Sequence, residues 1–95
     1  MWFKVEEVVK NEGRIDICIA NAGILYEAEC LDYPAETFLK VLDVNVSGHV
    51  HCPSRWTGDG TVGTRGSFIL MASMNGSINP GQHWTAYNTS KAAVI

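Results

Sequence analysis

The chain has 95 residues, of which 46% are hydrophobic and 18% charged, and its formal net charge is −3. That length allows a single domain with a modest core, and this composition is typical of a globular chain rather than a disordered one. The seven basic residues form no run, which excludes a nucleic-acid-binding function, and no apolar stretch reaches the roughly 20 residues that span a bilayer.

The first two elements along the chain are predicted to be a helix and a strand. Apolar residues recur among charged ones over residues 2–12, which favours an amphipathic helix that ends near Gly13. Residues 15–20 form a short apolar run that is typical of a buried strand. A turn signal at residues 21–23 closes this strand, and residues 24–34 have the composition of a loop.

A second helix and a second strand follow, separated by a stretch without a regular pattern. The second helix opens at Pro34 and carries an apolar stripe at helical spacing as far as Val46. Pro53 and four glycines then break any regular element over residues 53–66. Residues 67–72 form another apolar run, which predicts a second buried strand.

The last predicted element is a helix that begins near Trp84 or Thr85, after a polar loop over residues 73–83. Strands and helices alternate, and both strands are apolar throughout, which indicates βαβ units in a parallel sheet covered on both faces. Two strands alone leave both sheet edges unpaired. We therefore expect residues 1–95 to form a single partial α/β domain, part of a doubly wound parallel sheet, with about two strands and three helices.

Two features of the sequence favour a location in the cytoplasm. The N-terminal residues 1–7 include acids where a signal peptide needs an apolar core. Cys18, Cys30 and Cys52 are odd in number and contain no Cys-x-x-Cys pair, so we interpret them as reduced thiols.

A glycine-rich hexamer in the irregular stretch matches the dinucleotide-binding pattern G-x-G-x-x-G at Gly58, Gly60 and Gly63. That pattern works only with a strand before it and a helix after it, because the pyrophosphate must meet a helix N-terminus. Here a loop that contains Pro53 precedes the hexamer and a predicted strand follows it. We therefore interpret the hexamer as a linker and not as a cofactor site.

Tyr87 and Lys91 form the most informative pair in the sequence, because they lie four residues apart in the last predicted helix. Residues at that spacing share one helix face, so we expect the ammonium group of Lys91 beside the phenol of Tyr87. A nearby cation favours the ionised phenol and lowers its pKa from the usual value of about 10 toward neutrality. A tyrosine tuned in this way can act as a general acid or base.

Other signals precede this pair in a definite order, each at the end of a predicted strand or on a predicted helix. They are the motif Asn21, Ala22 and Gly23 after the first strand, then Asn45 on the second helix, and Ser73 after the second strand. The whole set resembles the short-chain dehydrogenase/reductase family, whose Asn-Ala-Gly motif, catalytic Asn, Ser and Tyr-x-x-x-Lys occur in this order. The resemblance covers nearly the whole chain except residues 53–66 and implies a Rossmann-like fold.

The resemblance implies catalytic roles for three of these residues. Tyr87 would be the general acid or base on the substrate oxygen, and Lys91 would lower the pKa of Tyr87 and bind the nicotinamide ribose hydroxyls. Ser73 would hydrogen-bond the reacting carbonyl or alcohol and hold it in line for hydride transfer.

The resemblance also implies supporting roles at two other places. The backbone of Asn45 would hold a water molecule that links the catalytic lysine to solvent. Asn21, Ala22 and Gly23 would shape the end of the first strand beside the adenosine half of the cofactor, with Gly23 allowing the backbone to approach closely.

Structural interpretations stay open beside these roles. Asn45 could simply end the second helix ahead of Gly48. Ser73 could be an ordinary turn serine, and Ser77 is an adjacent candidate for its role.

The histidines of the chain have no assigned chemistry. His83 and its neighbour Trp84 could line a substrate pocket or belong to a surface loop. His49 and His51 lack further ligands at suitable spacing, so we predict no metal site.

The amino-acid sequences of two segments narrow the resemblance to one group within the family. Residues 67–78, Ser-Phe-Ile-Leu-Met-Ala-Ser-Met-Asn-Gly-Ser-Ile, and residues 85–94, Thr-Ala-Tyr-Asn-Thr-Ser-Lys-Ala-Ala-Val, are similar to fungal members of the family. These members include NADP-dependent mannitol dehydrogenases, arabinitol dehydrogenases and L-xylulose reductases. The resemblance implies NADP or NAD as cofactor and a small carbonyl or alcohol substrate, such as a ketose or polyol. It also implies that full-length relatives are homo-oligomers.

Departures from the family pattern leave three interpretations of the chain. Family members begin with a strand and a Thr-Gly-x-x-x-Gly-x-Gly turn, and residues 1–95 contain neither that turn nor the family's C-terminal substrate-pocket segments. Residues 53–66 depart from the helix that the family continues there, and a misread exon or shifted frame is one hypothesis for them. The chain is interpreted as an incomplete NAD(P)-dependent oxidoreductase, as a catalytically inactive remnant of one, or as a small α/β binding module.

Overall fold

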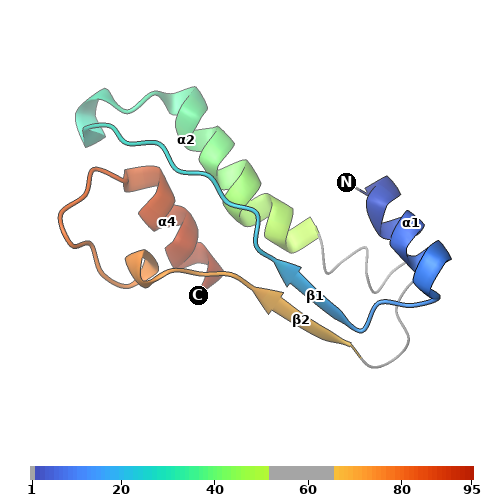
Figure 1. Cartoon of the computed structure of the whole chain (residues 1–95). Coiled ribbons are helices and arrows are strands. Elements are labelled where there is room, and N and C mark those ends of the chain that lie inside the picture. The colour runs from blue at the N-terminus through green and yellow to red at the C-terminus, as the bar shows by residue number, and fades with distance from the viewer. Residues whose placement is uncertain (1, 52–65) are drawn as a thin grey trace.

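The computed structural model of the chain describes residues 2–51 and 66–95. Helices and strands alternate along these residues, as the sequence predicts. They are α1 (Trp2–Glu12), β1 (Ile17–Ala20), α2 (Ala35–Leu42), β2 (Ser67–Leu70) and α4 (Thr85–Val94), shown in Figure 1. The left-handed Gly13 ends the first helix, with a φ of 85° that suits glycine.

β1 and β2 pair in parallel, in register from Ile17 opposite Ser67 to Ala20 opposite Leu70. Parallel neighbours need a crossover connection between them, and α2 lies within that connection. The predicted α/β class, part of a doubly wound parallel sheet, is thereby confirmed.

The sheet is less covered than its apolar runs predict. Ile17 and Ile19 on β1 are 64% and 53% exposed, and Ile69 and Leu70 on β2 are 45% and 43% exposed. In Figure 1, α4 and most of α2 lie beyond the C-terminal ends of the strands, so they leave much of the sheet open. An apolar strand is stable when other elements bury both of its faces, but its sequence does not show which elements do so.

The buried core lies instead between α2 and α4, which pack against each other. Val41 and Ala86 are fully buried, and so are Asn45 and Ser90, which lie four residues further along the two helical segments. Positions four apart share one helix face. Each packing face therefore carries one apolar residue followed by one polar residue.

The second helix continues to residue 51, past Val46, where the apolar stripe predicted from the sequence ends. Residues 43–47 form a π turn and residues 48–51 return to α-helix. The N–H of Gly48 donates to the carbonyl of Asp43, five residues back, which is the spacing of a π turn. Asn45 therefore lies inside a continuous helix, and the interpretation of Asn45 as a helix-ending residue is wrong.

Three further expectations from the sequence concern the irregular stretch, membrane-spanning helices and metal sites. Residues 53–65 of the irregular stretch, including the glycine hexamer, lie outside the described residues. Among residues 2–51 and 66–95, no helix is long and apolar enough to cross a membrane. No group of three His, Cys, Asp or Glu side chains that could hold a metal ion occurs in those same ranges.

Gly76 sets how closely the loop after β2 packs on α4. It ends a short 3-10 turn, Met74–Gly76. A Cβ atom built at Gly76 would lie 2.7 Å from both the carbonyl carbon and the carbonyl oxygen of Lys91. These are backbone atoms of a helix and cannot give way independently. The absence of a side chain at Gly76 thus lets this loop lie against the helical turn of Lys91.

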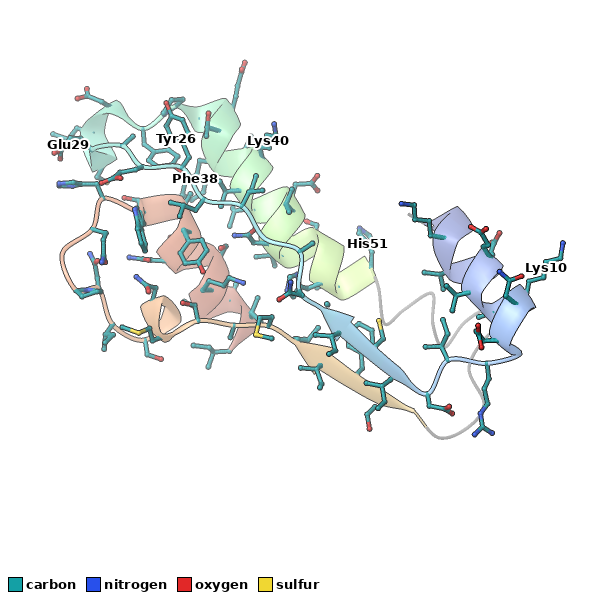
Figure 2. All side chains as sticks on the ribbon, in the orientation of Figure 1. Lys10, Tyr26, Glu29, Phe38, Lys40 and His51 are labelled. Atoms are coloured by element: carbon teal, nitrogen blue, oxygen red, sulfur yellow. The ribbon has the colours of Figure 1, made fainter. Side chains whose placement is uncertain are left out.

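An aromatic cluster joins the loop after β1 to the start of α2. The rings of Tyr26 and Tyr33 meet edge to face at 5.8 Å between centroids, and Tyr33 and Phe38 do so at 6.1 Å. Tyr26 and Phe38 are labelled in Figure 2. The hydroxyl of Tyr33 donates a hydrogen bond of 3.1 Å to the carbonyl of Tyr26. Partial burial, and secondarily the neighbouring phenol of Tyr26, raises the pKa of Tyr33 above its usual value.

Replacing Gly76 with alanine should destabilise the chain, because the new methyl group meets helix backbone. We expect the free energy of unfolding to fall by about 1–3 kcal/mol. Gly48→Ala is the matched control, because Gly48 is helical and a Cβ there meets only the Asp43 carbonyl at 3.7 Å. That control should stabilise the chain by about 0.5–1 kcal/mol. Urea unfolding of both variants measures the difference, and equal effects would contradict the proposed close approach.

The raised pKa of Tyr33 predicts a loss of stability in alkali. Below the unfolded-state pKa of about 10 the phenol is neutral in both states, and as the pH rises further the unfolded chain ionises more readily. Stability should therefore fall as the pH passes through this range. Tyr33→Phe should flatten the fall, as measured by unfolding at pH 8 to 11, while Tyr26→Phe should flatten it less, because the Tyr26 phenol is only the secondary cause of the raised pKa of Tyr33. A Tyr33→Phe chain that loses stability as steeply as the parent would contradict this prediction.

Candidate active site

Asn45 joins three segments of the chain from a fully buried position. Its side-chain Oδ1 accepts a hydrogen bond of 2.8 Å from the N–H of Ile24, and its Nδ2 donates one of 2.9 Å to the carbonyl of Ile24. The same Nδ2 donates to the hydroxyl of Ser90 at 2.9 Å. One amide thus connects the loop after β1, the π turn of the second helix, and α4.

Lys91 places a buried ammonium group at the meeting point of these segments. Only 3% of the residue is exposed, and its Nζ donates a hydrogen bond of 2.8 Å to the carbonyl of Met71, just after β2. The Nζ also lies 5.7 Å from the centroid of the Tyr87 ring, so the two side chains are neighbours on α4. A Cβ built at Gly23 would lie 3.7 Å from this Nζ, which brings the loop after β1 to the same place.

The ammonium group of Lys91 keeps unused hydrogen-bonding capacity. An ammonium carries three hydrogens, and in the described part of the chain the carbonyl of Met71 takes one of them. A buried charge is costly unless its hydrogens find partners. The two remaining hydrogens therefore suit a ligand with paired hydroxyl groups, such as a ribose, at this position.

Gly23 is not forced to be glycine by the protein itself. A Cβ there would meet Asn45 Oδ1 at 3.5 Å and Lys91 Nζ at 3.7 Å, which are ordinary contacts, and its φ lies outside the left-handed region. Asn21 and Ala22 precede it and are exposed beyond the end of β1. The structure thus places the three-residue motif at the carboxyl end of a parallel strand, next to the buried lysine.

Ser73 lies in extended backbone just after β2 and caps the short 3-10 turn. Its Oγ accepts a hydrogen bond of 3.2 Å from the N–H of Asn75 and lies 3.5 Å from Asn75 Oδ1. Among the described residues, no hydrogen bond joins Ser73 to Tyr87. Ser77 lies beyond this turn and is exposed. The structure therefore shows a local capping contact for Ser73, and its hydroxyl hydrogen makes only the long contact to Asn75.

The loop before α4 is paired with the loop after β1. Ala28 and Trp84 form a parallel bridge, and the N–H of Ala28 donates to the carbonyl of His83 at 3.1 Å. The His83 ring lies 3.4 Å from the carboxylate of Glu29, but both side chains are more than half exposed, so this pair contributes little stability. Glu29 lies at the outer end of the molecule in Figure 2.

Trp84 packs on the candidate acid/base residue. Its ring meets the Tyr87 ring edge to face, with centroids 5.9 Å apart and an interplanar angle of 81°. In the described ranges, 2–51 and 66–95, the buried Nε1 of Trp84 has no hydrogen-bond partner. Of the two open interpretations, a surface position suits His83, while Trp84 forms a wall beside Tyr87.

Several groups that hold the site together were missed by reasoning from the sequence. The backbone carbonyl of Met71 and the backbone of Ile24 carry no residue signature, because any residue can supply them. Ser90 has a weak signal, since it follows Ala86 by four residues and both are small. Gly76 has one in the Asn75-Gly76 dipeptide, which marks a turn but not its contact with α4.

Comparison with known proteins gives one consistent relationship. A family model described as short chain dehydrogenase matches residues 4–95. An L-xylulose reductase of Hypocrea jecorina is 38% identical, over 96% of this chain and 38% of its own length. An NADP-dependent mannitol dehydrogenase of the same species is 35% identical, over 96% of this chain and 35% of its own length.

Solved structures show the same relationship in three dimensions. An NAD+-bound xylitol dehydrogenase superposes with a TM-score of 0.82 at 34% identity, over 96% of this chain and 35% of that one. A short-chain type dehydrogenase/reductase from Mycobacterium marinum superposes with a TM-score of 0.80 at 38% identity, over 96% of this chain and 38% of that one. The chain thus spans a little over one third of the length of these relatives.

Asn45→Asp should disrupt the buried network although the two side chains have nearly the same shape. An oxygen in place of Nδ2 would face the Ile24 carbonyl and the Ser90 hydroxyl without a hydrogen to donate. We expect the free energy of unfolding to fall by about 3 kcal/mol. Asn75→Asp is the matched control, because the buried Nδ2 of Asn75 has no partner among the residues that the structure describes, so no such bond is lost. Thermal unfolding measures both, and a similar loss in both variants would contradict this role of Asn45.

Proposed function

Because the chain belongs to the short-chain dehydrogenase family, we propose that it carries the acid/base part of an NAD(P)-dependent oxidoreductase that interconverts a carbonyl and an alcohol. The observation that carries this proposal is the buried ammonium of Lys91 beside Tyr87, which among the described residues donates one hydrogen bond, to the carbonyl of Met71. A nicotinamide cofactor, when bound, supplies or accepts the hydride. The residues of this chain then have to move a proton and to orient the reacting oxygen.

Tyr87 is the proton donor in the reducing direction and the proton acceptor in the oxidising direction. The ammonium of Lys91, with its Nζ 5.7 Å from the centroid of the Tyr87 ring, would stabilise the phenolate that remains after the proton is given up. Trp84 covers part of the Tyr87 ring, which limits the access of water to one side of it. These contacts support an acid/base role for Tyr87.

Ser73 orients the substrate oxygen in this proposal. Its Oγ lone pair is used by the N–H of Asn75, whereas its hydrogen has only the long contact with Oδ1 of that residue. The hydroxyl can therefore donate to a substrate carbonyl or alcohol oxygen. Ser73 and Lys91 both approach the carboxyl end of β2, where Met71 lies.

Lys91 and Gly23 form the cofactor side of the site. The two spare ammonium hydrogens of Lys91 would bind the ribose hydroxyls next to the nicotinamide. The motif of Asn21, Ala22 and Gly23 would line the end of β1 beside the adenosine half. A strand end in a parallel α/β sheet is where such ligands bind, which supports this assignment.

Asn45 would hold a water molecule through its backbone carbonyl and so connect Lys91 to solvent. A π turn lengthens the hydrogen-bonding step of a helix by one residue, which leaves a backbone group in the turn without its usual partner. Asn45 lies in the middle of such a turn, over residues 43–47. This position supports the proposed water relay.

The names of the similar proteins support a polyol or ketose as the substrate. They include an L-xylulose reductase, mannitol dehydrogenases and a sorbose reductase of Schizosaccharomyces pombe. Both NADP and NADH occur in these names, so either nicotinamide dinucleotide remains a candidate. Homo-oligomers of the full-length relatives and a cytoplasmic location remain predictions from the sequence.

The exposed sheet favours a second candidate, in which the 95-residue chain is catalytically inactive by itself. Ile17 and Ile19 are more than half exposed, so β1, the strand that carries the proposed cofactor motif at its end, is open to solvent. A strand that lacks cover holds the cofactor motif less firmly, and hydride transfer needs the cofactor to be positioned closely.

Nucleotide binding separates these candidates. We expect NADPH or NADH added to the purified chain to show a weak but saturable change in nicotinamide fluorescence. Lys91→Met should weaken that binding roughly tenfold, because the charged donor is lost. Lys40→Met is the matched control, since Lys40 lies exposed on α2 (Figure 2). Circular dichroism verifies that each variant keeps its helices.

Turnover tests the acid/base role. NADPH-dependent reduction of xylulose or fructose should be lost in Tyr87→Phe, while nucleotide binding is kept. Absence of binding and turnover in the parent chain would favour the inactive candidate. Equal binding by the parent and Lys91→Met would contradict the assignment of the cofactor side.

A further inference from the structure

Ser90 is a buried polar residue at a position where helix packing alone favours a small apolar one. It is fully buried on the face of α4 that meets the second helix, four residues after the fully buried Ala86. A hydroxyl in such a place is costly unless it is hydrogen-bonded. Alanine would fill nearly the same volume without that cost. The hydrogen bonds of the hydroxyl, and not the size of the side chain, therefore explain a serine at this position.

The direction of these hydrogen bonds follows from the single hydrogen on the hydroxyl. Ser90 Oγ donates to the carbonyl of Tyr87 at 2.7 Å, and the carbonyl can only accept. Toward Asn45, 2.9 Å away, Ser90 Oγ must therefore act as an acceptor. Only the NH₂ end of the Asn45 amide can satisfy it.

The opposite side of the Asn45 amide meets an equally fixed pair of groups. The Ile24 carbonyl accepts from Nδ2 and the Ile24 N–H donates to Oδ1. Both Nδ2 hydrogens are then used, and only one of the two amide orientations satisfies all three partners. Because the Ser90 hydroxyl donates its hydrogen bond to the backbone carbonyl of Tyr87, its Oγ is left as an acceptor that matches this orientation.

This network reaches the ammonium of Lys91 through Gly23, the residue before Ile24. A Cβ at Gly23 would lie 3.5 Å from Asn45 Oδ1 and 3.7 Å from Lys91 Nζ. A rotation of the Asn45 amide would release Ile24 and move this stretch of loop relative to the ammonium group. The Tyr87 carbonyl is held by the same serine, so both members of the acid/base pair depend on it.

We propose that Ser90 is a positioning residue: its hydroxyl accepts the second Nδ2 hydrogen of the Asn45 amide, whose orientation the Ile24 backbone sets, and so ties the turn of α4 that carries Tyr87 and Lys91 to the loop after β1. Its importance for the reaction rests on the function proposed above. The tie itself is a property of the folded chain and can be measured without turnover.

The neighbouring residue supplies a matched control. Thr89 Oγ1 donates a hydrogen bond of 2.7 Å to the carbonyl of Thr85, one helical turn back, but its side chain is on the exposed face. Ser90 and Thr89 therefore share the bond from a hydroxyl to the helix backbone. Only Ser90 adds the bond from Asn45.

Nuclear magnetic resonance of the ¹⁵N-labelled full chain tests the tie directly. In the parent chain we expect the Asn45 side-chain NH₂ signals to exchange slowly with solvent. Ser90→Ala should speed that exchange roughly tenfold and shift the backbone N–H signal of Ile24, because one hydrogen bond to the amide is lost. Thr89→Ala should leave both signals unchanged. A merely structural role for Ser90 would not single out the Asn45 amide in this way.

A second variant keeps the test decisive if Ser90→Ala unfolds the chain. Ser90→Cys has a similar side-chain size, but a thiol is a weak donor and acceptor, so it should fold and show the same change in the Asn45 signals. Asn45 signals that respond equally to the Ser90 and Thr89 variants, or to neither, would overturn the proposal.

Nucleotide binding measured on the same samples separates this proposal from the proposed function. Ser90→Cys should weaken NADPH binding several-fold, roughly fivefold for the loss of one hydrogen bond, while Thr89→Ala binds like the parent. A parent chain that binds neither nucleotide would sink the proposed function, whereas the NMR comparison would still decide whether Ser90 holds the Asn45 amide. Normal binding by Ser90→Cys with disturbed Asn45 signals would overturn the positioning role.

Discussion

The side-chain amide of Asn45 makes its three hydrogen bonds from a position without solvent, where a missed bond is costly. Two of them go to the backbone of Ile24 and resemble a strand pairing carried out by a side chain. The third crosses to α4. In the described α2 and α4 the buried apolar residues are Val41 and Ala86, and this polar junction adds bonds that fix how the helices and the loop after β1 sit together. The place of Lys91, and with it the candidate site, follows from that junction.

Local patterns sufficed for the elements themselves. Gly13 ends a helix because a left-handed residue there favours glycine, and the alternation of apolar runs with helical stripes indicated parallel strands joined by a crossover. The π turn around Asn45 was not predictable, since a five-residue hydrogen-bonding step leaves almost the same hydrophobic spacing as an α-helix. Burial of Ile17 and Ile19 was overestimated, because an apolar pattern states that a face needs cover and not which segment provides it.

Local spacing and motif order also predicted some of the residues that lie together in the candidate site. Spacing alone places Tyr87 and Lys91 on one face, and motif order brought Asn21 and Asn45 into the same argument. What the sequence could not reveal is the role of backbone groups. The carbonyl of Met71 is the partner of the buried ammonium, and any residue could provide it. Ser73 also accepts a hydrogen bond from the N–H of Asn75, a capping contact that its motif does not predict.

The bridge between Ala28 and Trp84 closes a circuit with the Asn45 junction. From Ile24 the path runs through Asn45 and Ser90 to α4, back along that helix to its start at Trp84, and through Ala28 to Ile24 again. In mechanical terms this is a closed linkage, in which a rotation at one joint has to be matched by rotations at others. The turn of α4 that carries Tyr87 belongs to this linkage, so a shift of the loop after β1 must either move that turn or lengthen one of these bonds.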